Sequence, residues 1–212
     1  MNQQDPNQPM VYPLFSAPIY THVVRSFELP DIKKFEFTSR GPTGEHPFLS
    51  SVNKHILDLP EFKQIHDILL EEIDNHARNT LCVSNKIEFY ITNSWININR
   101  PGDQCAPHTH NNSLISGVLY LKSPERSGEL FFYRDILSLL PFPPALDLET
   151  SAQNIFNSKH FGIDPKVNEV CLFPSVIMHS AGINESSEER WCLPFNVFIR
   201  GDVGGLHELT LK

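Results

Sequence analysis

Two histidines stand directly before an apolar run in the stretch HTHNNSLISGVLYL, residues 108–121. His108 and His110 are two positions apart, and on an extended chain such residues point to the same side, with Cα atoms roughly 6.6 Å apart. Imidazole nitrogens bind metal ions at about 2.0–2.1 Å, so both rings could reach one ion. A metal also needs a third protein ligand, for which His179 is the best candidate. The alternative is chance, because the chain holds 10 histidines.

Arg190 follows His179 by eleven residues and begins the next predicted strand. A turn and an antiparallel return between them would bring the two side chains close together. A guanidinium group beside a metal offers the fork of donors that binds the far carboxylate of a metal-bound keto acid. The alternative is a surface ion pair between Arg190 and Glu188 or Glu189.

Alternation along the predicted strands places further polar side chains on shared faces. Asn196 lies on the same side of its strand as Arg190, and Ser116 on the same side as Tyr120. Together with Asn97 on an earlier strand, these residues could line one cavity, where a polar ligand would satisfy their hydrogen bonds. The alternative for each is a role in capping a strand end or in bonding to neighbouring backbone.

Strands are the elements that must position these side chains. After residue 85 the hydrophobic pattern has a period of two, and Gly, Pro, Asn and Ser separate the segments. Many short strands at this spacing predict a mainly β chain of the sandwich or jelly-roll type, with few helices. The predicted strands are residues 87–99, 113–121, 128–133, 169–174, 176–183 and 190–200.

The whole chain, residues 1–212, is predicted to form a single domain. Residues 1–84 form an N-terminal support region with some strand and a helix from about Pro60 to Ala77, where apolar residues recur at three- and four-residue steps. Residues 85–200 form the core that carries the candidate site. The long, Pro-rich segment 135–164 is predicted to be a flap over one mouth of the jelly roll.

Composition narrows the class of protein. The net charge is −8 and no cluster of Lys and Arg is present, which argues against nucleic acid as the main partner. The four cysteines form no CxxC motif, as expected for reduced thiols in a cytoplasm. The N-terminus shows no signal peptide, and no apolar run is long enough for a membrane helix. We therefore expect a soluble, cytoplasmic protein.

Taken together, three blocks of the chain resemble the phage and bacterial 2-oxoglutarate/Fe(II)-dependent oxygenases. The resemblance covers roughly residues 85 to 200 and rests on a Ser-Trp-x-Asn strand, an H-x-H core, an SG-x-L-x-F strand, a Phe-Pro turn, a distal His, and an Arg before a Phe-Asn ending. These blocks are SWININRPGDQCAPHTHNNSLISGVLYLKSPERSGELFFYRD, CLFPSVIMHSAGIN and ERWCLPFNVF.

The resemblance implies a double-stranded β-helix, the cupin-like jelly roll, with iron at its open end. It implies that His108, His110 and His179 are metal ligands, that Arg190 binds the C5 carboxylate of 2-oxoglutarate, and that Tyr120 and Asn97 bond to the same cosubstrate. His110 stands where the wider superfamily usually has Asp. The carboxylates of Asp103, Glu129 and Asp135 are candidates to replace it as ligand, but none falls at a matching offset.

The implied function is that of a dioxygenase, acting as a hydroxylase. It would couple oxidative decarboxylation of 2-oxoglutarate to oxidation by O₂ of a small-molecule or protein substrate. Two alternatives stay open: a cupin-type dioxygenase with three histidines that does not use 2-oxoglutarate, and a non-enzymatic jelly-roll binding module that contains a metal. Structural zinc normally takes four protein ligands, and three are evident here.

Overall fold

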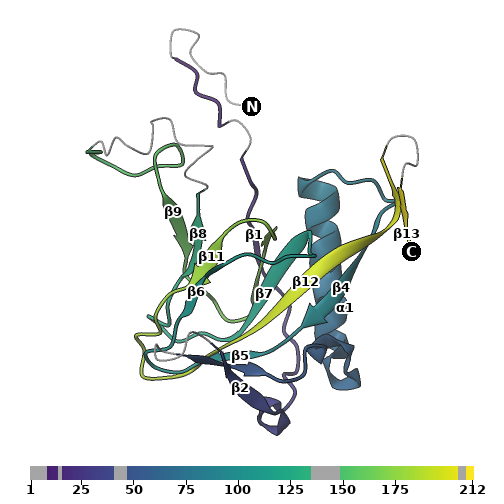
Figure 1. Cartoon of the computed structure of the whole chain (residues 1–212), viewed down its shortest axis with the longest axis vertical. Helices are drawn as coiled ribbons and strands as arrows, with labels where there is room; N and C mark the ends of the chain where they lie inside the picture. The colour runs from purple at the N-terminus through teal and green to yellow at the C-terminus, as the bar shows by residue number, and fades with distance from the viewer. Residues whose placement is uncertain (1–8, 14–15, 41–46, 135–148, 205–208) are drawn as a thin grey trace.

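The computed structural model describes residues 9–13, 16–40, 47–134, 149–204 and 209–212. These residues form mainly antiparallel β-sheet, as the period-two pattern predicts, together with one principal helix (Figure 1). None of the described helices is long and apolar enough to cross a lipid bilayer.

Two sheets make up the described β structure. The strands of the larger sheet are β1 (Tyr20–Val23), β2 (Phe37–Arg40), β3 (Phe48–Ser51), β4 (Glu88–Ser94), β5 (Asn97–Asn99), β7 (Ile115–Lys122), β10 (Glu169–Pro174), β12 (Arg190–Val203) and β13 (Leu209–Leu211). Their order is β1-β10-β7-β12-β5-β3-β2, and β4 and β13 each pair with β12. The smaller sheet contains β6 (Cys105–His108), β8 (Leu130–Tyr133), β9 (His160–Ile163) and β11 (His179–Ala181). Its order is β6-β11-β8-β9.

The helix α1 (Lys63–Asn75) lies within the segment predicted to be helical. It follows the short 3-10 turns η1 (Ile32–Lys34), η2 (Ile56–Asp58) and η3 (Pro60–Phe62), and it continues into a π-turn, η4 (His76–Thr80). The apolar residues at three- and four-residue spacing form one buried stripe, because such positions share a helix face. They are Phe62, Ile65, Leu69, Ile73 and Ala77, all fully buried.

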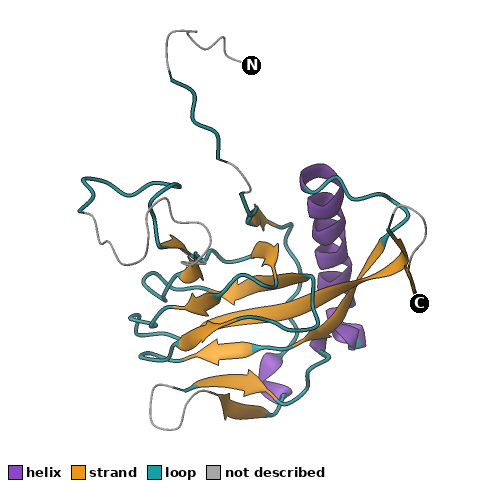
Figure 2. Ribbon diagram, turned by 45° about the horizontal axis from the view of Figure 1, so that its top comes forward, coloured by secondary structure: helices purple, strands orange, loops and turns teal. Residues whose placement is uncertain are grey.

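The larger sheet is covered on both faces (Figure 2). Successive residues of a strand point to opposite faces, and on β7 both faces are buried. Leu119 and Leu121 belong to the core cluster that includes the residues of α1, whereas Val118 and Tyr120 pack with Leu130 and other residues of the smaller sheet. The fold is therefore three layers: helix, large sheet and small sheet.

The strand predicted at residues 87–99 is divided into β4 and β5. The division lies at Trp95 and Ile96, opposite Pro194 of β12. Pro194 has no N–H group, so it can accept the bond from the Trp95 N–H but cannot return one. The Ile96 N–H donates instead to Ser51 Oγ at 3.0 Å. Trp95, at this break, lines the cavity of the candidate site described below.

Other boundaries differ from the sequence prediction. Within the predicted strand 176–183 only His179–Ala181 forms β11, because a turn occupies the preceding residues. Of the predicted flap, residues 135–148 lie outside the described residues, and residues 160–163 form β9, which pairs with β8 at the edge of the smaller sheet.

Candidate metal centre

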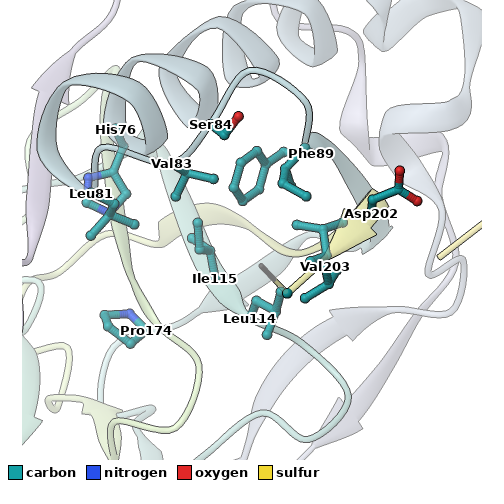
Figure 3. Close-up of a pocket in the computed structure, with 13 residues that line it drawn as sticks. His76, Leu81, Val83, Ser84, Phe89, Leu114, Ile115, Pro174, Asp202 and Val203 are labelled. Atoms are coloured by element: carbon teal, nitrogen blue, oxygen red, sulfur yellow. The ribbon is translucent and has the colours of Figure 1, made fainter. Parts of the chain in front are cut away.

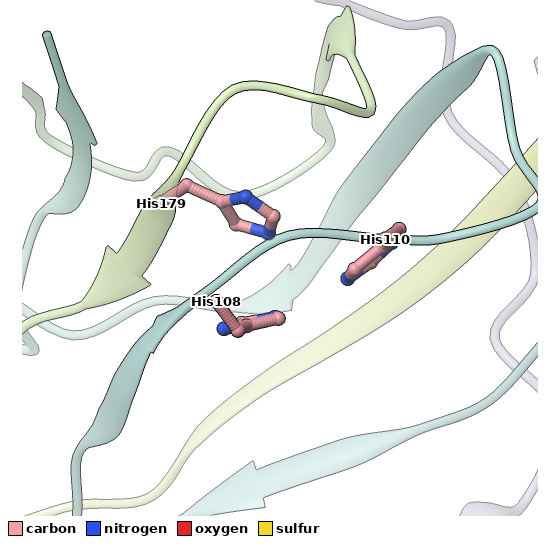
Figure 4. Close-up of side chains that lie close together, drawn as sticks. All are labelled: His108, His110 and His179. Carbon is pink, nitrogen blue, oxygen red and sulfur yellow. The ribbon is translucent and has the colours of Figure 1, made fainter. Parts of the chain in front are cut away.

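His108, His110 and His179 come together at one end of the space between the sheets (Figure 4). Their potential ligand atoms all lie within 4.8 Å of one another. His108 and His179 are register partners on the neighbouring strands β6 and β11, and their ring centroids are 4.3 Å apart. The His110 ring lies 5.1 Å from His108 and 5.0 Å from His179. The predicted convergence of three imidazoles is thus present.

The hydrogen bonds of the three rings orient their nitrogens. Nδ1 of His108 lies 2.9 Å from the Ala106 carbonyl oxygen, and Nδ1 of His179 lies 3.0 Å from the Ile177 carbonyl oxygen. Nδ1 of His110 lies 2.6 Å from Asn196 Oδ1. Because these oxygens only accept, each Nδ1 carries the proton, and each Nε2 keeps a lone pair. This arrangement is common for histidines that bind a metal.

Burial keeps two of these imidazoles in the form that binds metals. It lowers the pKa of His179 to about 4, against a smaller opposing effect of its bond to the Ile177 carbonyl. Burial also lowers the pKa of His110, although the hydrogen bond that His110 donates to Asn196 opposes the shift. A neutral imidazole has the free lone pair that a metal requires, so both rings are ready to bind at neutral pH.

No carboxylate of the described residues joins the three histidines. Across the described part of the chain, they form the only cluster of His, Cys, Asp or Glu ligand atoms. Asp103 instead accepts from the side chain of Arg100 at 3.0 Å, and Glu129 is outside the cluster. Asp135 lies outside the described residues.

A cavity of about 140 Å³ adjoins the histidines. Three of the five residues predicted to bind a cosubstrate line it, namely Arg190, Tyr120 and Asn97. The volume is smaller than the 300–1,000 Å³ of pockets for drug-sized ligands. The cavity therefore suits one small molecule beside the metal position.

Arg190 carries the charge of this cavity. The residue is only 1% exposed, and its Nη1 donates to the carbonyl oxygens of Ser127 and Gly128, both at 2.7 Å. Its Nε and Nη2 are buried and have no hydrogen-bond partner among the described residues. A buried guanidinium without a counter-charge is costly. An anionic ligand in the cavity would satisfy both free donors.

The alternative surface ion pair of Arg190 is not formed. Glu188 pairs with Lys122 at 2.8 Å, and Glu189 accepts from the indole N–H of Trp191 at 2.9 Å. Both acidic residues are therefore engaged away from Arg190, which points inward.

Two neighbouring amides also have unsatisfied atoms. Asn97 Oδ1 and Asn99 Nδ2 are buried without a partner among the described residues, and Asn99 is the register partner of Arg190. Sequence reasoning did not assign Asn99 to the site, although Asn97 and Asn99 are two apart and share a strand face. Tyr120 is also deeply buried, and burial raises its pKa well above the usual range. Its hydroxyl therefore stays protonated and able to donate.

The other two predicted cosubstrate residues lie behind His110 and do not line the cavity. Asn196 Oδ1 accepts from Ser116 Oγ at 3.1 Å as well as from His110. Ser116 Oγ also lies 2.9 Å from His110 Nδ1 and 2.9 Å from Ser175 Oγ. Ser116 and Asn196 therefore hold the His110 ring in position.

A larger cavity of about 530 Å³ lies elsewhere, between the end of α1 and the far part of β12 (Figure 3). Apolar side chains such as Phe89, Leu114 and Val203 make up most of its lining. It contains none of the three clustered histidines, so the candidate chemistry belongs to the smaller cavity.

Comparison with known proteins finds a match to one family model. Residues 93–196 match a family model described as "Putative 2OG-Fe(II) oxygenase". No curated protein matches the chain.

Similar solved structures include a 2OG-Fe(II) oxygenase family oxidoreductase from Burkholderia pseudomallei, with a TM-score of 0.54, 15% identity, and coverage of 76% of this chain and 71% of that one. The epimerase SnoN from nogalamycin biosynthesis has a TM-score of 0.55 and 13% identity, over 84% of this chain and 77% of SnoN. HygX from Streptomyces hygroscopicus, solved with nickel and 2-oxoglutarate, has a TM-score of 0.51 and 11% identity, over 78% of this chain and 74% of HygX. These likenesses confirm the predicted double-stranded β-helix fold.

Proposed function

Through residues 93–196 the chain belongs to the 2-oxoglutarate- and Fe(II)-dependent oxygenases, and on that premise we propose that His108, His110 and His179 hold the iron while Arg190 binds 2-oxoglutarate. Membership makes the protein an oxidoreductase whose cofactors are Fe(II) and 2-oxoglutarate. One observation carries the assignment of residues. Three converging imidazoles share a small cavity with a buried guanidinium that has two donor atoms without a partner among the described residues.

The residues fit these cofactors by their chemistry. Imidazole is a good ligand for iron, and the fixed Nδ1 protons leave three Nε2 lone pairs for it. A dicarboxylate carries two negative charges, and the far one would find its counter-charge in Arg190. When bound, iron and 2-oxoglutarate supply the oxidising chemistry: O₂ is consumed, 2-oxoglutarate is converted to succinate and CO₂, and the substrate is oxidised.

The remaining side chains of the cavity orient the cosubstrate. The Tyr120 hydroxyl can donate to a carboxylate oxygen, and the unpartnered Asn99 Nδ2 offers a second neutral donor. Arg190, Tyr120 and Asn99 are all buried, and a low local dielectric strengthens hydrogen bonds. The preferred reaction is hydroxylation of a small-molecule or protein substrate, in a bacterial or phage-borne cytoplasmic enzyme. The free thiol state of all four cysteines agrees with that location.

One observation favours a second function. The all-histidine ligand set lacks the carboxylate of the usual two-histidine, one-carboxylate site. A dioxygenase with three histidines that binds its substrate directly would not need 2-oxoglutarate. In the first function Arg190 binds 2-oxoglutarate, whereas in the second it has no 2-oxoglutarate to bind.

Binding of 2-oxoglutarate to the Ni(II)-loaded protein tests the proposal, because nickel holds the site without turnover. Isothermal titration calorimetry should show 2-oxoglutarate binding that weakens by about a hundredfold in Arg190→Ala, while Ni(II) affinity is retained. Arg126→Ala is the matched control, since Arg126 is exposed and pairs with Glu185 at 2.9 Å. Unchanged 2-oxoglutarate affinity in Arg190→Ala would refute the role of Arg190, and no binding to the unaltered protein would favour the second function.

A further inference from the structure

Lys54 lies next to Trp95, which lines the cavity, although Lys54 itself is not one of the lining residues. Its Nζ is 5.8 Å from the centre of the Trp95 ring, and that ring is 5.9 Å from the His110 ring. Trp95 lines the cavity together with Phe48. The Trp95 ring therefore lies between the Lys54 ammonium group and the histidine cluster.

The ammonium group of Lys54 has no ion-pair partner among the residues that the structure describes. It donates to Ser50 Oγ at 2.8 Å and to the Ser51 carbonyl oxygen at 2.6 Å, and both acceptors are neutral. A lysine has three N–H donors, so one is left for a ligand. None of the ion pairs among the described residues includes Lys54 or Arg40.

Arg40 adds a second positive charge at this edge. It is exposed on β2, opposite Phe48 of β3, and together with burial it lowers the pKa of Lys54. Burial is the larger cause. Two neighbouring cations without a described carboxylate are notable in a chain whose net charge is −8.

Lys54 and Arg40 together form a cationic edge, which is separate from the position of Arg190. Arg190 pairs in register with Asn99, whereas Lys54 contacts Trp95, four residues earlier along the same stretch of chain. Four residues of extended chain span roughly 13 Å. The cavity of about 140 Å³ has room for one small molecule, so a substrate bound along with 2-oxoglutarate must lie toward the rim.

We infer that Lys54, assisted by Arg40, binds an anionic group of the oxidised substrate, so that the substrate is an organic anion whose apolar part lies against Trp95 and Phe48. The inference rests on the proposed function, since it assigns the substrate of the same site. A carboxylate and a phosphate present the same chemistry to an ammonium group. Either would take the third N–H of Lys54 and neutralise the edge.

Calorimetry on the protein loaded with Ni(II) and saturated with 2-oxoglutarate tests this, with phenylacetate, phenyl phosphate and the neutral benzyl alcohol as probes. We expect at least one anion to bind, at least tenfold more weakly to Lys54→Met, a few-fold more weakly to Arg40→Met, and nearly normally to Lys54→Arg. Benzyl alcohol should bind more weakly and equally to all variants. The tighter of the two anions identifies the carboxylate or phosphate source.

Lys122→Met is the matched control. Lys122 also lies over a tryptophan, 5.6 Å from the centre of the Trp191 ring, but it pairs with Glu188, and Trp191, unlike Trp95, does not line the cavity. Equal anion affinity of the unaltered protein and Lys54→Met, tight binding of benzyl alcohol, or no anion binding at all would overturn the inference. If Ni(II) and 2-oxoglutarate bind normally in that experiment, only the substrate assignment fails. If they do not bind, the proposed function fails with it.

Discussion

Three imidazoles give the proposed iron site a charge one unit more positive than two imidazoles and a carboxylate would. His110 is held through Asn196 and Ser116, so its ring is fixed in the proposed site. With Fe(II) bound and Arg190 nearby, the cavity would be strongly positive before 2-oxoglutarate enters, which favours such a dianion.

Asn196, whose Oδ1 accepts from His110 Nδ1, is expected to position the His110 ring for metal binding. In Asn196→Ala the ring loses its 2.6 Å partner, and we expect Ni(II) affinity to fall about tenfold, since partners of metal-binding histidines are worth about 10–100-fold. Ser116 Oγ limits the loss, so the double variant with Ser116→Ala should lose more. Calorimetric Ni(II) titration measures both.

Asn93→Ala is the control for Asn196→Ala. Asn93 is the register partner of Asn196 on β4, and it accepts from Thr92 without contacting a histidine. If Asn196→Ala and Asn93→Ala bind Ni(II) equally well, the positioning role of Asn196 is wrong.

Sequence reasoning identified the residues whose side chains can do chemistry, because spacing by two predicts a shared strand face. It found the three histidines, Arg190 and Tyr120. It did not separate residues that line the cavity from those that support a ligand, as with Ser116 and Asn196. That distinction depends on which strands pair across the sheet, which one sequence does not encode locally.

Strand pairing explains the role of Gly117 on β7. It is the register partner of Phe195 on β12, and a Cβ added there would lie 2.2 Å from Phe195 Cζ. Phe195 is fully buried, so its ring has little room to move. The absent side chain of Gly117 lets the two strands pair beside the cavity.

Gly117→Ala should therefore reduce the free energy of unfolding by about 1–3 kcal/mol, as is typical of overpacked cores. Urea denaturation followed by circular dichroism provides the measurement. Gly162→Ala is the control, because a Cβ there would meet the Glu129 side chain, which can move aside at the sheet edge. A loss at Gly162 as large as at Gly117 would contradict this explanation.

At the level of elements, the sequence predicted α1 and the central strands well, since these have long apolar patterns. It missed β2, β3, β6, β9 and β13, which are three or four residues long and too short for a period to stand out. It also joined β4 and β5, because the break depends on Pro194 of a distant strand.

In the whole molecule, the helix layer and the smaller sheet, which carries His108 and His179 of the candidate site, lie on opposite faces of the larger sheet. His76, at the end of α1, is 1% exposed and lies 5.2 Å from the Tyr20 ring of β1. Its Nδ1 has no partner among the described residues, and burial lowers its pKa below the ordinary value of 6.5. The helix layer therefore contains a neutral, buried histidine.

Acid should weaken this layer. As the pH falls below about 6.5, His76 becomes protonated in the unfolded chain but stays neutral in the folded chain. The free energy of unfolding therefore decreases as the pH falls below that value. Thermal unfolding of the metal-free protein between pH 7.5 and 5 should show a smaller loss of stability in His76→Phe than in the unaltered protein. Parallel pH dependence in the two would show that His76 is not responsible.

The most direct test of the central claim is an anaerobic titration of the protein with Fe(II) and then 2-oxoglutarate, followed by visible absorption. We predict a weak charge-transfer band that requires both additions, is lost in His179→Ala, and needs far more 2-oxoglutarate in Arg190→Ala. The absence of any band from the unaltered protein, with Fe(II) bound and 2-oxoglutarate in excess, would contradict the account.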